Sequence, residues 1–290
     1  MRRRILFFLL LFESLMGFGQ EKTGQIDLFC GAELNYGDTN VMRLYDVLIN
    51  LTPGVKWNMG SGWMMAGQLS YAAVNNGYNK KYNYLRLGIL ALSKELSFKD
   101  DNHLKFTAGL FSRERYGVDV RWMKPINSWL MLQARAGLVS TWWLSTKEQE
   151  FDTRKWTTTA VVGANVWIDK WATEFRLSGG RYINEDYGME GEVYCHFKHC
   201  SIGAFVQWHE TYYQYLVKNT YNYSGGFRVV MMIPPYKKSE KKVTVRPASN
   251  FRLTYNAQSD GYSMKKYHTD PEENEREYQT NVKWGTGLYR

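Results

Sequence analysis

The sequence contains no run of about 20 consecutive apolar residues, the length that an α-helix needs to cross a bilayer. A shorter apolar run, Ile5–Phe12, follows the basic residues Arg2–Arg4 near the start of the chain. That order is typical of a secretory signal peptide, and Gly19 supplies a small residue at the cleavage site. No cysteine lies within this leader, which argues against a lipid-anchored amino terminus. We therefore predict an exported chain with a signal peptide at residues 1–19.

The sequence also lacks a recognisable catalytic constellation. Nucleophilic catalysis needs a nucleophile, a neighbouring base and a group that orients the base. None of the five histidines has a serine partner that spacing identifies. The pair His209-Glu210 lacks the second histidine of a helical zinc-protease motif. We therefore predict that the protein is not an enzyme and has no cofactor.

What the chain has instead is an alternation of apolar and polar residues at period two, from about residue 25 to about residue 233. Met189 and Val193, for example, share one face of a predicted strand, whereas Glu190 and Glu192 share the other. A strand that is apolar on one face and charged on the other suits a wall between lipid and water. Aromatic residues form 16% of the chain, and many stand near predicted strand ends, as in the aromatic girdles of membrane barrels. A soluble β-sandwich is the alternative.

The lengths of the connections favour the membrane barrel. They are mostly short after even-numbered strands and longer after odd-numbered strands, as expected for short periplasmic turns and longer outer loops. We therefore predict an all-β fold, a transmembrane antiparallel up-and-down β-barrel of about 12 strands, located in the outer membrane and spanning residues 20–233. The predicted strands are 25–36, 44–58, 63–74, 82–95, 103–112, 116–124, 128–142, 155–168, 171–183, 187–197, 200–210 and 220–233.

The character of the chain changes after Ile233, where two prolines cannot continue a strand ladder. Residues 234–290 are predicted to form a periplasmic C-terminal extension, in which the acidic stretch 270–275 is expected to be an exposed loop. Two alternating runs, 251–257 and 278–289, favour some order. The sequence leaves open whether the extension is a small appendage, a plug of the barrel, or two further strands.

The densest local motif is Cys195-His196-Phe197-Lys198-His199-Cys200. Cysteine and histidine are good zinc ligands. If Phe197-Lys198 form a two-residue turn, however, Cys195 lies opposite Cys200, within reach of a disulfide, and the compartment is oxidising. We predict a disulfide between Cys195 and Cys200 and no metal site; two thiols or a metal site are the alternatives.

Charged residues on the inward parity form a second constellation. Such residues either pair across the lumen of a small barrel and close it, or line a narrow polar passage. The bases slightly outnumber the acids among them, which favours anionic solutes. Trp142 and Trp143, in an outer loop, could stack on sugar rings or pack within the loop. The predicted lumen-lining residues are Arg86, Asp119, Arg121, Arg135, Glu174, Arg176, Glu190, Glu192 and Arg228.

The formal net charge of the chain is +9, and the leader contributes three arginines to it. An exported protein is not expected to bind nucleic acid. We expect outer-membrane lipid around the barrel, with lipopolysaccharide phosphates or an acidic polysaccharide as anionic partners.

The stretch Val230-Met231-Met232-Ile233-Pro234-Pro235-Tyr236, with Val245-Arg246-Pro247 and 251–256 after it, resembles the YjbH family of exopolysaccharide- and capsule-associated outer-membrane proteins. The resemblance implies a non-enzymatic role in the export or assembly of surface polysaccharide. It also implies polysaccharide or periplasmic export proteins as partners. The alternatives are a narrow passive channel for small anionic solutes and a closed structural barrel that displays its outer loops.

Overall fold

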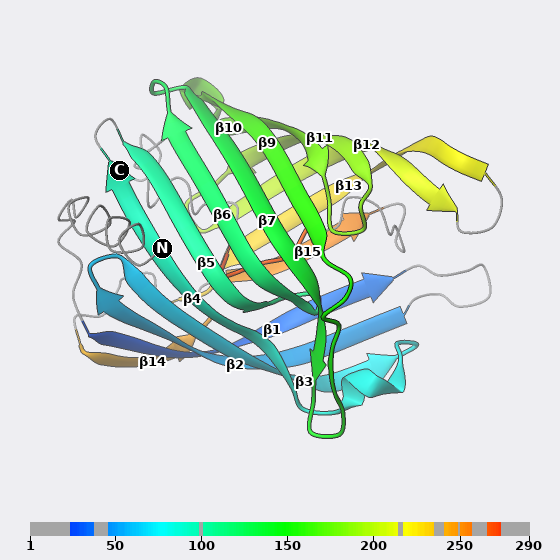
Figure 1. Cartoon of the computed structure of the whole chain (residues 1–290). Helices are drawn as coiled ribbons and strands as arrows, with labels where there is room; N and C mark the ends of the chain where they lie inside the picture. The colour runs from blue at the N-terminus through cyan, green and yellow to red at the C-terminus, as the bar shows by residue number, and fades with distance from the viewer. Residues whose placement is uncertain are drawn as a thin grey trace, which may run out of the picture.

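The chain folds into a single curled β-sheet (Figure 1). The computed structural model describes residues 24–37, 46–98, 101–213, 217–234, 241–248, 250–256 and 266–273. Within these ranges, the helical segments are two short 3₁₀ turns, η1 (Lys80–Asn83) and η2 (Asp169–Trp171). No helix in the described part of the chain is long and apolar enough to cross a membrane. The predicted signal peptide and the alternating run 278–289 lie outside the described residues.

Twelve of the strands pair antiparallel, each with its neighbour in chain order. They match the twelve predicted strands one to one, so the prediction of an all-β, up-and-down fold is confirmed. A further short strand, β8 (Gln149–Phe151), folds back on the end of β7. The twelve are β1 (Gln25–Gly37), β2 (Asp46–Gly60), β3 (Trp63–Asn76), β4 (Arg86–Phe98), β5 (Asn102–Phe111), β6 (Arg115–Pro125), β7 (Leu130–Leu144), β9 (Thr157–Ile168), β10 (Thr173–Arg181), β11 (Tyr187–His196), β12 (Cys200–Tyr213) and β13 (Val217–Met232).

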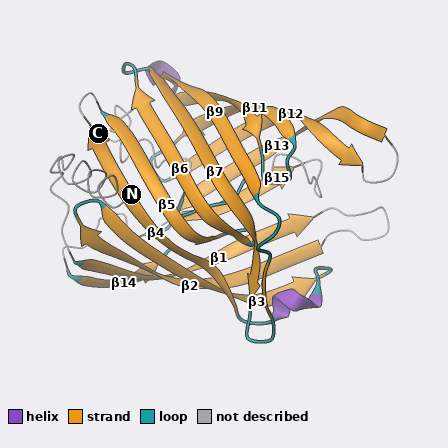
Figure 2. Cartoon of the chain, viewed as in Figure 1, coloured by secondary structure: helices purple, strands orange, loops and turns teal. Residues whose placement is uncertain are grey.

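The connections differ in length between the two ends of the sheet (Figure 2). At one end the turns are tight, as between β2 and β3, where Ser61 and Gly62 have φ values of 52° and 75°. Positive φ at both central residues gives the two-residue turn whose twist matches that of a hairpin. At the other end most connections are longer, such as 77–85 and 145–156. This agrees with the alternation in loop length expected from the sequence.

The prediction that twelve strands close on themselves is wrong, because β1 and β13 do not pair with each other. Instead, β14 (Val243–Pro247) pairs parallel with β1, and β15 (Asn250–Asn256) pairs antiparallel with β13. Both short strands run in the same direction and follow one another in the chain. No ladder between β14 and β15 closes the sheet into a barrel. Part of the predicted extension is therefore built into the sheet. Directly after β14, Ala248 N–H continues the pairing with β1 by donating to Cys30 C=O, at 2.9 Å.

The two faces of the sheet have opposite chemistry. The inner face buries ionic and polar side chains, including Asp119, Glu174 and Glu190, which are 0–2% exposed. The outer face exposes large apolar side chains, which is the reverse of the usual pattern in water. The exposed apolar side chains of the strands include Leu28, Leu51, Leu69, Leu90, Leu92, Val118, Leu138, Val162, Phe175, Leu177, Met189, Ile202, Val206, Phe227 and Met231.

One strand departs from the predicted parity. Gln68 pairs with Ile89 but Leu69 pairs with Leu87, so Gly88 of β4 is an extra residue in the ladder. Such a bulge moves every later side chain of the strand to the opposite face. Ile89 and Ala91, which the alternation predicts on the outer face, are therefore buried, whereas Leu90 is 44% exposed.

A small apolar cluster lies on the inner face beside the charged residues. Ile89, Ala91, Phe111 and Val139 come from the sheet and contact Ile183 and Tyr267. Tyr267 belongs to the C-terminal stretch 266–273, which we call the tail segment. The cluster therefore joins the tail segment to the wall.

Candidate functional site

The charged inner face is the candidate functional site. Eight of the nine predicted lumen-lining residues belong to connected groups of ion pairs and hydrogen bonds on this face. Arg86 lies apart from them. Its guanidinium donates to the Tyr82 C=O at 2.8 Å and stacks on the Tyr82 ring, 4.9 Å from the centroid.

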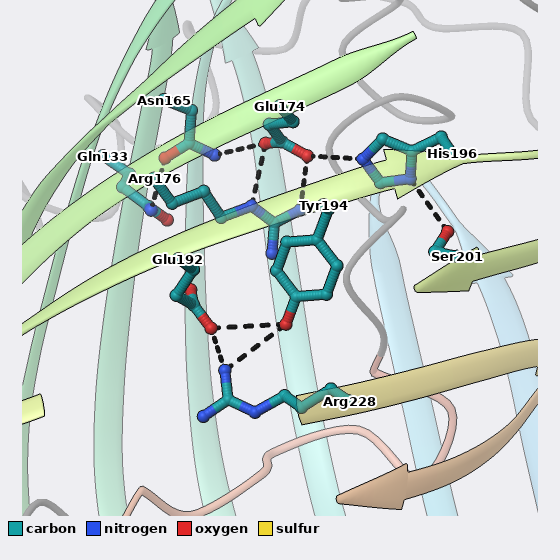
Figure 3. A network of polar contacts seen from close by, with 9 residues as sticks. All are labelled: Gln133, Asn165, Glu174, Arg176, Glu192, Tyr194, His196, Ser201 and Arg228. Atoms are coloured by element: carbon teal, nitrogen blue, oxygen red, sulfur yellow. Dashed lines mark hydrogen bonds and ion pairs between the residues drawn. The ribbon is translucent and has the colours of Figure 1, made fainter. Parts of the chain in front are cut away.

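The first group is centred on Glu174 of β10 and lies entirely within the strands (Figure 3). The Glu174 carboxylate, 0% exposed, accepts hydrogen bonds from Arg176 Nε and Nη2 at 2.8 and 2.7 Å and from Asn165 Nδ2 at 2.9 Å. Asn165 in turn accepts from Gln133 at 2.9 Å. A buried carboxylate needs paired charge and satisfied lone pairs, and this one has both.

The structure also brings together a serine and a histidine that sequence spacing did not connect. His196 Nε2 lies 2.9 Å from Glu174 Oε2, and His196 Nδ1 lies 2.8 Å from Ser201 Oγ, across the β11–β12 hairpin. This chain of contacts has the connectivity of a hydrolytic triad. The Ser201 side chain, however, is 0% exposed, and Glu174 is already bound by Arg176. The Ser201 hydroxyl is therefore out of reach of a substrate in this structure. We interpret the contacts among Glu174, His196 and Ser201 as a structural link between strands.

Arg228 of β13 connects the first group to the rest of the interior. It forms ion pairs with Glu192 and, at 3.0 Å, with Glu190, and its Nη1 donates to the Tyr194 hydroxyl at 3.3 Å. The Arg176 guanidinium lies 4.6 Å from the centroid of the Tyr194 ring. We call the set Gln133, Asn165, Glu174, Arg176, Glu192, Tyr194, His196, Ser201 and Arg228, which Figure 3 displays, the wall network.

The tail segment makes the second group of contacts, and it crosses the interior from β11 to β6. Lys266 Nζ lies 2.6 Å from Glu190 of β11. The Tyr267 hydroxyl donates to Asp119 of β6 at 2.6 Å, and its ring stacks on Phe111 of β5, with centroids 5.3 Å apart. The tail segment therefore lies against the inner face, and the described part of the C-terminal extension acts both as strands and as an interior plug.

Three carboxylates of the tail segment each contact bases of the sheet. Asp270 lies 2.6 Å from Lys56 of β2, and Glu272 forms a bidentate pair with Arg246 of β14, at 2.6 and 2.8 Å. Glu273 pairs with Arg121 of β6 and lies 3.5 Å from Arg135 of β7. The prediction of an exposed loop is wrong for residues 270–273, because Asp270 and Glu272 are 6% and 7% exposed; residues 274 and 275 lie outside the described residues. These acids are buried because they form ion pairs with bases on the inner face, which come from strands far apart in the chain. We call Lys56, Arg121, Arg135 and Arg246 the tail-facing bases.

The tail-facing bases explain why the acids are needed. Arg121 and Arg135 stand directly opposite each other on β6 and β7, and like charges in that position destabilise a sheet. Asp119 lies 2.8 Å from Arg135, and Glu273 contacts both arginines. The signal in the sequence was the excess of bases over acids on the inward parity. That excess indicated that further acids must neutralise the inward bases, but it did not indicate which segment of the chain supplies those acids.

The electrostatics of the tail segment follow from these pairs. Burial alone raises the pKa of the Asp270 carboxyl. The Lys56 and Lys105 ammoniums, with hydrogen bonds from Lys56 and the Glu272 N–H, together outweigh burial, so the pKa lies below its usual value. Burial likewise opposes ionisation of Glu273, and the Arg121 and Arg135 guanidiniums hold the pKa of that carboxyl well below its usual value. Burial raises the pKa of the Tyr267 hydroxyl, and the neighbouring Asp119 charge raises it further. The two acids are therefore anionic and the tyrosine neutral at pH 7.

The predicted disulfide is absent from the structure. No disulfide joins Cys195 to Cys200, because the hairpin register differs from the one assumed. His196 pairs with Ser201 and Cys195 with Ile202, so the loop is longer than two residues and Cys200 pairs with Met231 of β13 instead. Within the described ranges, no group of three or more His, Cys, Asp or Glu side chains is arranged to hold a metal ion.

The two tryptophans that were predicted in an outer loop lie at the end of β7 and are part of the packing rather than exposed platforms. Trp142 and Trp143 are 4% and 7% exposed. Trp142 stacks on Phe151 with centroids 6.4 Å apart, and Trp143 packs edge-on against Tyr82 at 5.5 Å. Stacking of a sugar ring on either face would need the loop to open.

Comparison with protein-family models, with curated proteins and with solved structures finds no match to this chain.

Proposed function

We propose that this chain is an outer-membrane protein that crosses the bilayer with its curled β-sheet. Its interior is filled by its own side chains, and it serves as a membrane-embedded scaffold rather than as an open pore. One observation carries the proposal. Along the strands, large apolar side chains such as Leu177 and Val206 are exposed on the outer face, at 55% and 62%, while ionic side chains are buried on the inner face. Lipid against the outer face removes the cost of exposing that apolar surface to water.

A charge placed on the outer face distinguishes lipid from water around the protein. We expect Leu177→Arg to lower the free energy of unfolding by about 2–4 kcal/mol in liposomes, the cost of a midplane arginine on a lipid-facing strand. The matched control is Glu150→Arg on the exposed strand β8, for which we expect a change of about 0.5 kcal/mol or less. Urea titration followed by tryptophan fluorescence measures both. Equal, small effects would show that the outer face contacts water, and would refute the proposal.

The closed interior argues against the passive channel. The wall network joins β7, β9, β10, β11, β12 and β13, and the tail segment bridges Glu190 of β11 to Asp119 of β6 and Lys56 of β2. A passage needs a continuous polar path, which this cross-paired arrangement opposes. In planar bilayers we expect no conductance steps from the full-length protein. Regular steps from the unmodified protein would instead support a channel for small anions.

The second candidate is assistance to the export or assembly of surface polysaccharide, with periplasmic export proteins as partners. The observation that favours it is the set of tail-facing bases, which could hold an anionic polymer in place of the tail carboxylates. Deletion of the coding sequence should reduce capsule or exopolysaccharide while leaving the membrane barrier to detergents intact. Unchanged polysaccharide would refute this role and leave the scaffold proposal standing.

A further inference from the structure

We propose that the tail segment covers a binding site for a carboxylated sugar chain, and that its residues occupy that site as an internal mimic of the ligand. The inference rests on the proposed function, because it names the chemistry that an exported, membrane-embedded sheet could hold on its inner face. It assigns to the tail segment a role that packing alone does not require.

The wall beneath the tail segment is rich in cationic donors. Lys56 and Arg246 receive Asp270 and Glu272, and Arg121 receives Glu273. Arg246 binds its carboxylate through two parallel N–H donors, at 2.6 and 2.8 Å, which is the geometry by which arginine recognises a carboxylate specifically. The wall therefore offers a row of carboxylate sites rather than a diffuse positive patch.

One donor in this row is unused. Among the described residues, Arg135 Nη2 is buried and has no hydrogen-bond partner. Arg135 already reaches Asp119 through Nε at 2.8 Å, and its Nη1 lies 3.5 Å from Glu273. A buried donor without a partner is destabilising, and a ligand carboxylate placed closer than Glu273 would remove that cost.

Beside the bases lies a place for a hydroxylated ring, which Tyr267 now fills. Its ring lies nearly parallel to Phe111, with an interplanar angle of 8°, and its hydroxyl donates to Asp119 at 2.6 Å. Gly137 makes room for that hydroxyl, because a Cβ there would lie 1.9 Å from the Tyr267 oxygen. The site thus combines an aromatic platform, an anionic acceptor for a hydroxyl, and neighbouring cations.

This combination selects an acidic sugar over the other anionic chains. A pyranose ring stacks on an aromatic face, and its hydroxyls donate hydrogen bonds to a carboxylate such as Asp119. Its own carboxylate pairs with the arginines. A plain acidic peptide satisfies the bases but supplies no hydroxylated ring, and a neutral sugar satisfies the platform but leaves the bases unpaired.

The test compares the full-length protein with a variant in which the tail carboxylates are neutral. Asp270→Asn/Glu272→Gln/Glu273→Gln keeps the shape of the tail and removes its ion pairs. The matched control, Asp101→Asn/Glu148→Gln/Glu150→Gln, removes the same number of acids from exposed positions. Binding is measured by calorimetry on folded protein in detergent, with trigalacturonate, maltotriose and triglutamate as probes.

We expect the tail variant to bind trigalacturonate at least about tenfold more tightly than the unmodified protein or the control, and to bind the other two probes no better. Adding Arg121→Gln/Arg135→Gln should remove the gain. No gain in the tail variant would overturn the proposal. Equal binding of triglutamate would show that the site detects charge alone, and equal binding of maltotriose would show that the bases play no part; either result refutes the carboxylated sugar.

A second measurement needs no variant and covers the case in which the tail variant fails to fold. Trigalacturonate should increase protease cleavage within the tail of the unmodified protein, because the ligand competes with the tail for its site. Maltotriose should leave cleavage unchanged. Protection by trigalacturonate, or no effect at saturating concentration, would contradict the competition. Because these assays use detergent-folded protein, their failure leaves the bilayer results on Leu177→Arg and conductance untouched, and the reverse also holds.

Discussion

The interior is filled in two different ways. On the side of β9–β13 the strands supply most of the contacts themselves. Glu174 and Arg176 find their partners within the wall network, and Arg228 pairs with Glu192 there and with Glu190 of β11. On the side of β1, β2, β6 and β7 the strands present bases, and the tail segment supplies the carboxylates. On the β9–β13 side, most of the residues that fill the interior belong to the strands themselves. The other side depends on the tail segment, which is not part of a strand.

The largest expected effect is on the side that the wall closes. Glu174→Ala leaves Arg176 and His196 buried without their carboxylate, and breaking a buried ion pair in this way costs about 3–5 kcal/mol. Urea unfolding in liposomes should show that loss. The control Glu148→Ala, at an exposed loop position, should change stability by about 0.5 kcal/mol or less. A loss below about 1 kcal/mol for Glu174→Ala would mean that water reaches this site.

A smaller effect is expected on the side that the tail closes. Glu273→Gln weakens the contacts to Arg121 and Arg135, but the tail can leave and expose the bases to water. We expect a loss of about 1–3 kcal/mol, confined to release of the tail. Limited proteolysis with mass spectrometry should then find cleavage near residues 266–273 increased roughly tenfold or more. Exposed Glu185→Gln is the control. Cleavage that begins within the strands would instead show that the tail and the wall unfold as one unit.

Acid should release the tail in the same way. The folded-state pKa values of Asp270 and Glu273 lie below the ordinary values of 3.8 and 4.5. Their ion pairs therefore stabilise the tail fully above those ordinary values, and the stabilisation is lost as the pH falls through the lower folded values. Cleavage by pepsin, an acid-active protease, should stay low at pH 4.5 and rise below about pH 3.5. A rise between pH 5 and 6 would point to histidine and contradict the assignment.

The smallest effect concerns the β11–β12 hairpin. Ser201→Ala removes one hydrogen bond to buried His196, with an expected loss of about 0.5–1.5 kcal/mol. Because no disulfide joins Cys195 to Cys200, reducing agent should leave the stability of the hairpin unchanged. A drop in stability with reductant would restore the disulfide and require the alternative register.

Much of the fold follows from the alternation of residues, because a strand with two chemically different faces has a side-chain period of two. That period placed the strands and separated Glu174 and Arg176 from Phe175 and Leu177. It failed at Gly88, where one extra residue reverses the faces of β4 and buries Ile89. A bulge depends on how two strands pair, and the sequence of one strand does not specify it.

The sequence predicted the residues of the candidate site that lie on strands, but not those that lie in the tail segment. Inward parity identified eight residues of the connected groups, while Lys266, Tyr267 and Glu273 were missed. His196 and Ser201 were missed for a related reason, because a hairpin register two residues different from the assumed one brings them together. In both cases the contact is set by pairing between segments.

The sequence by itself determined the all-β class, the twelve antiparallel strands and the opposite chemistry of their faces. Each of these features depends on residues that are close to one another along the chain. Only the tertiary structure decided how the two ends of the sheet meet and which acids neutralise the inward bases. Arg121 and Glu273 are 152 residues apart, and no local pattern records a partner at that distance. Burial of unpaired charge is what enforces the match, and it acts only once the sheet has formed an interior.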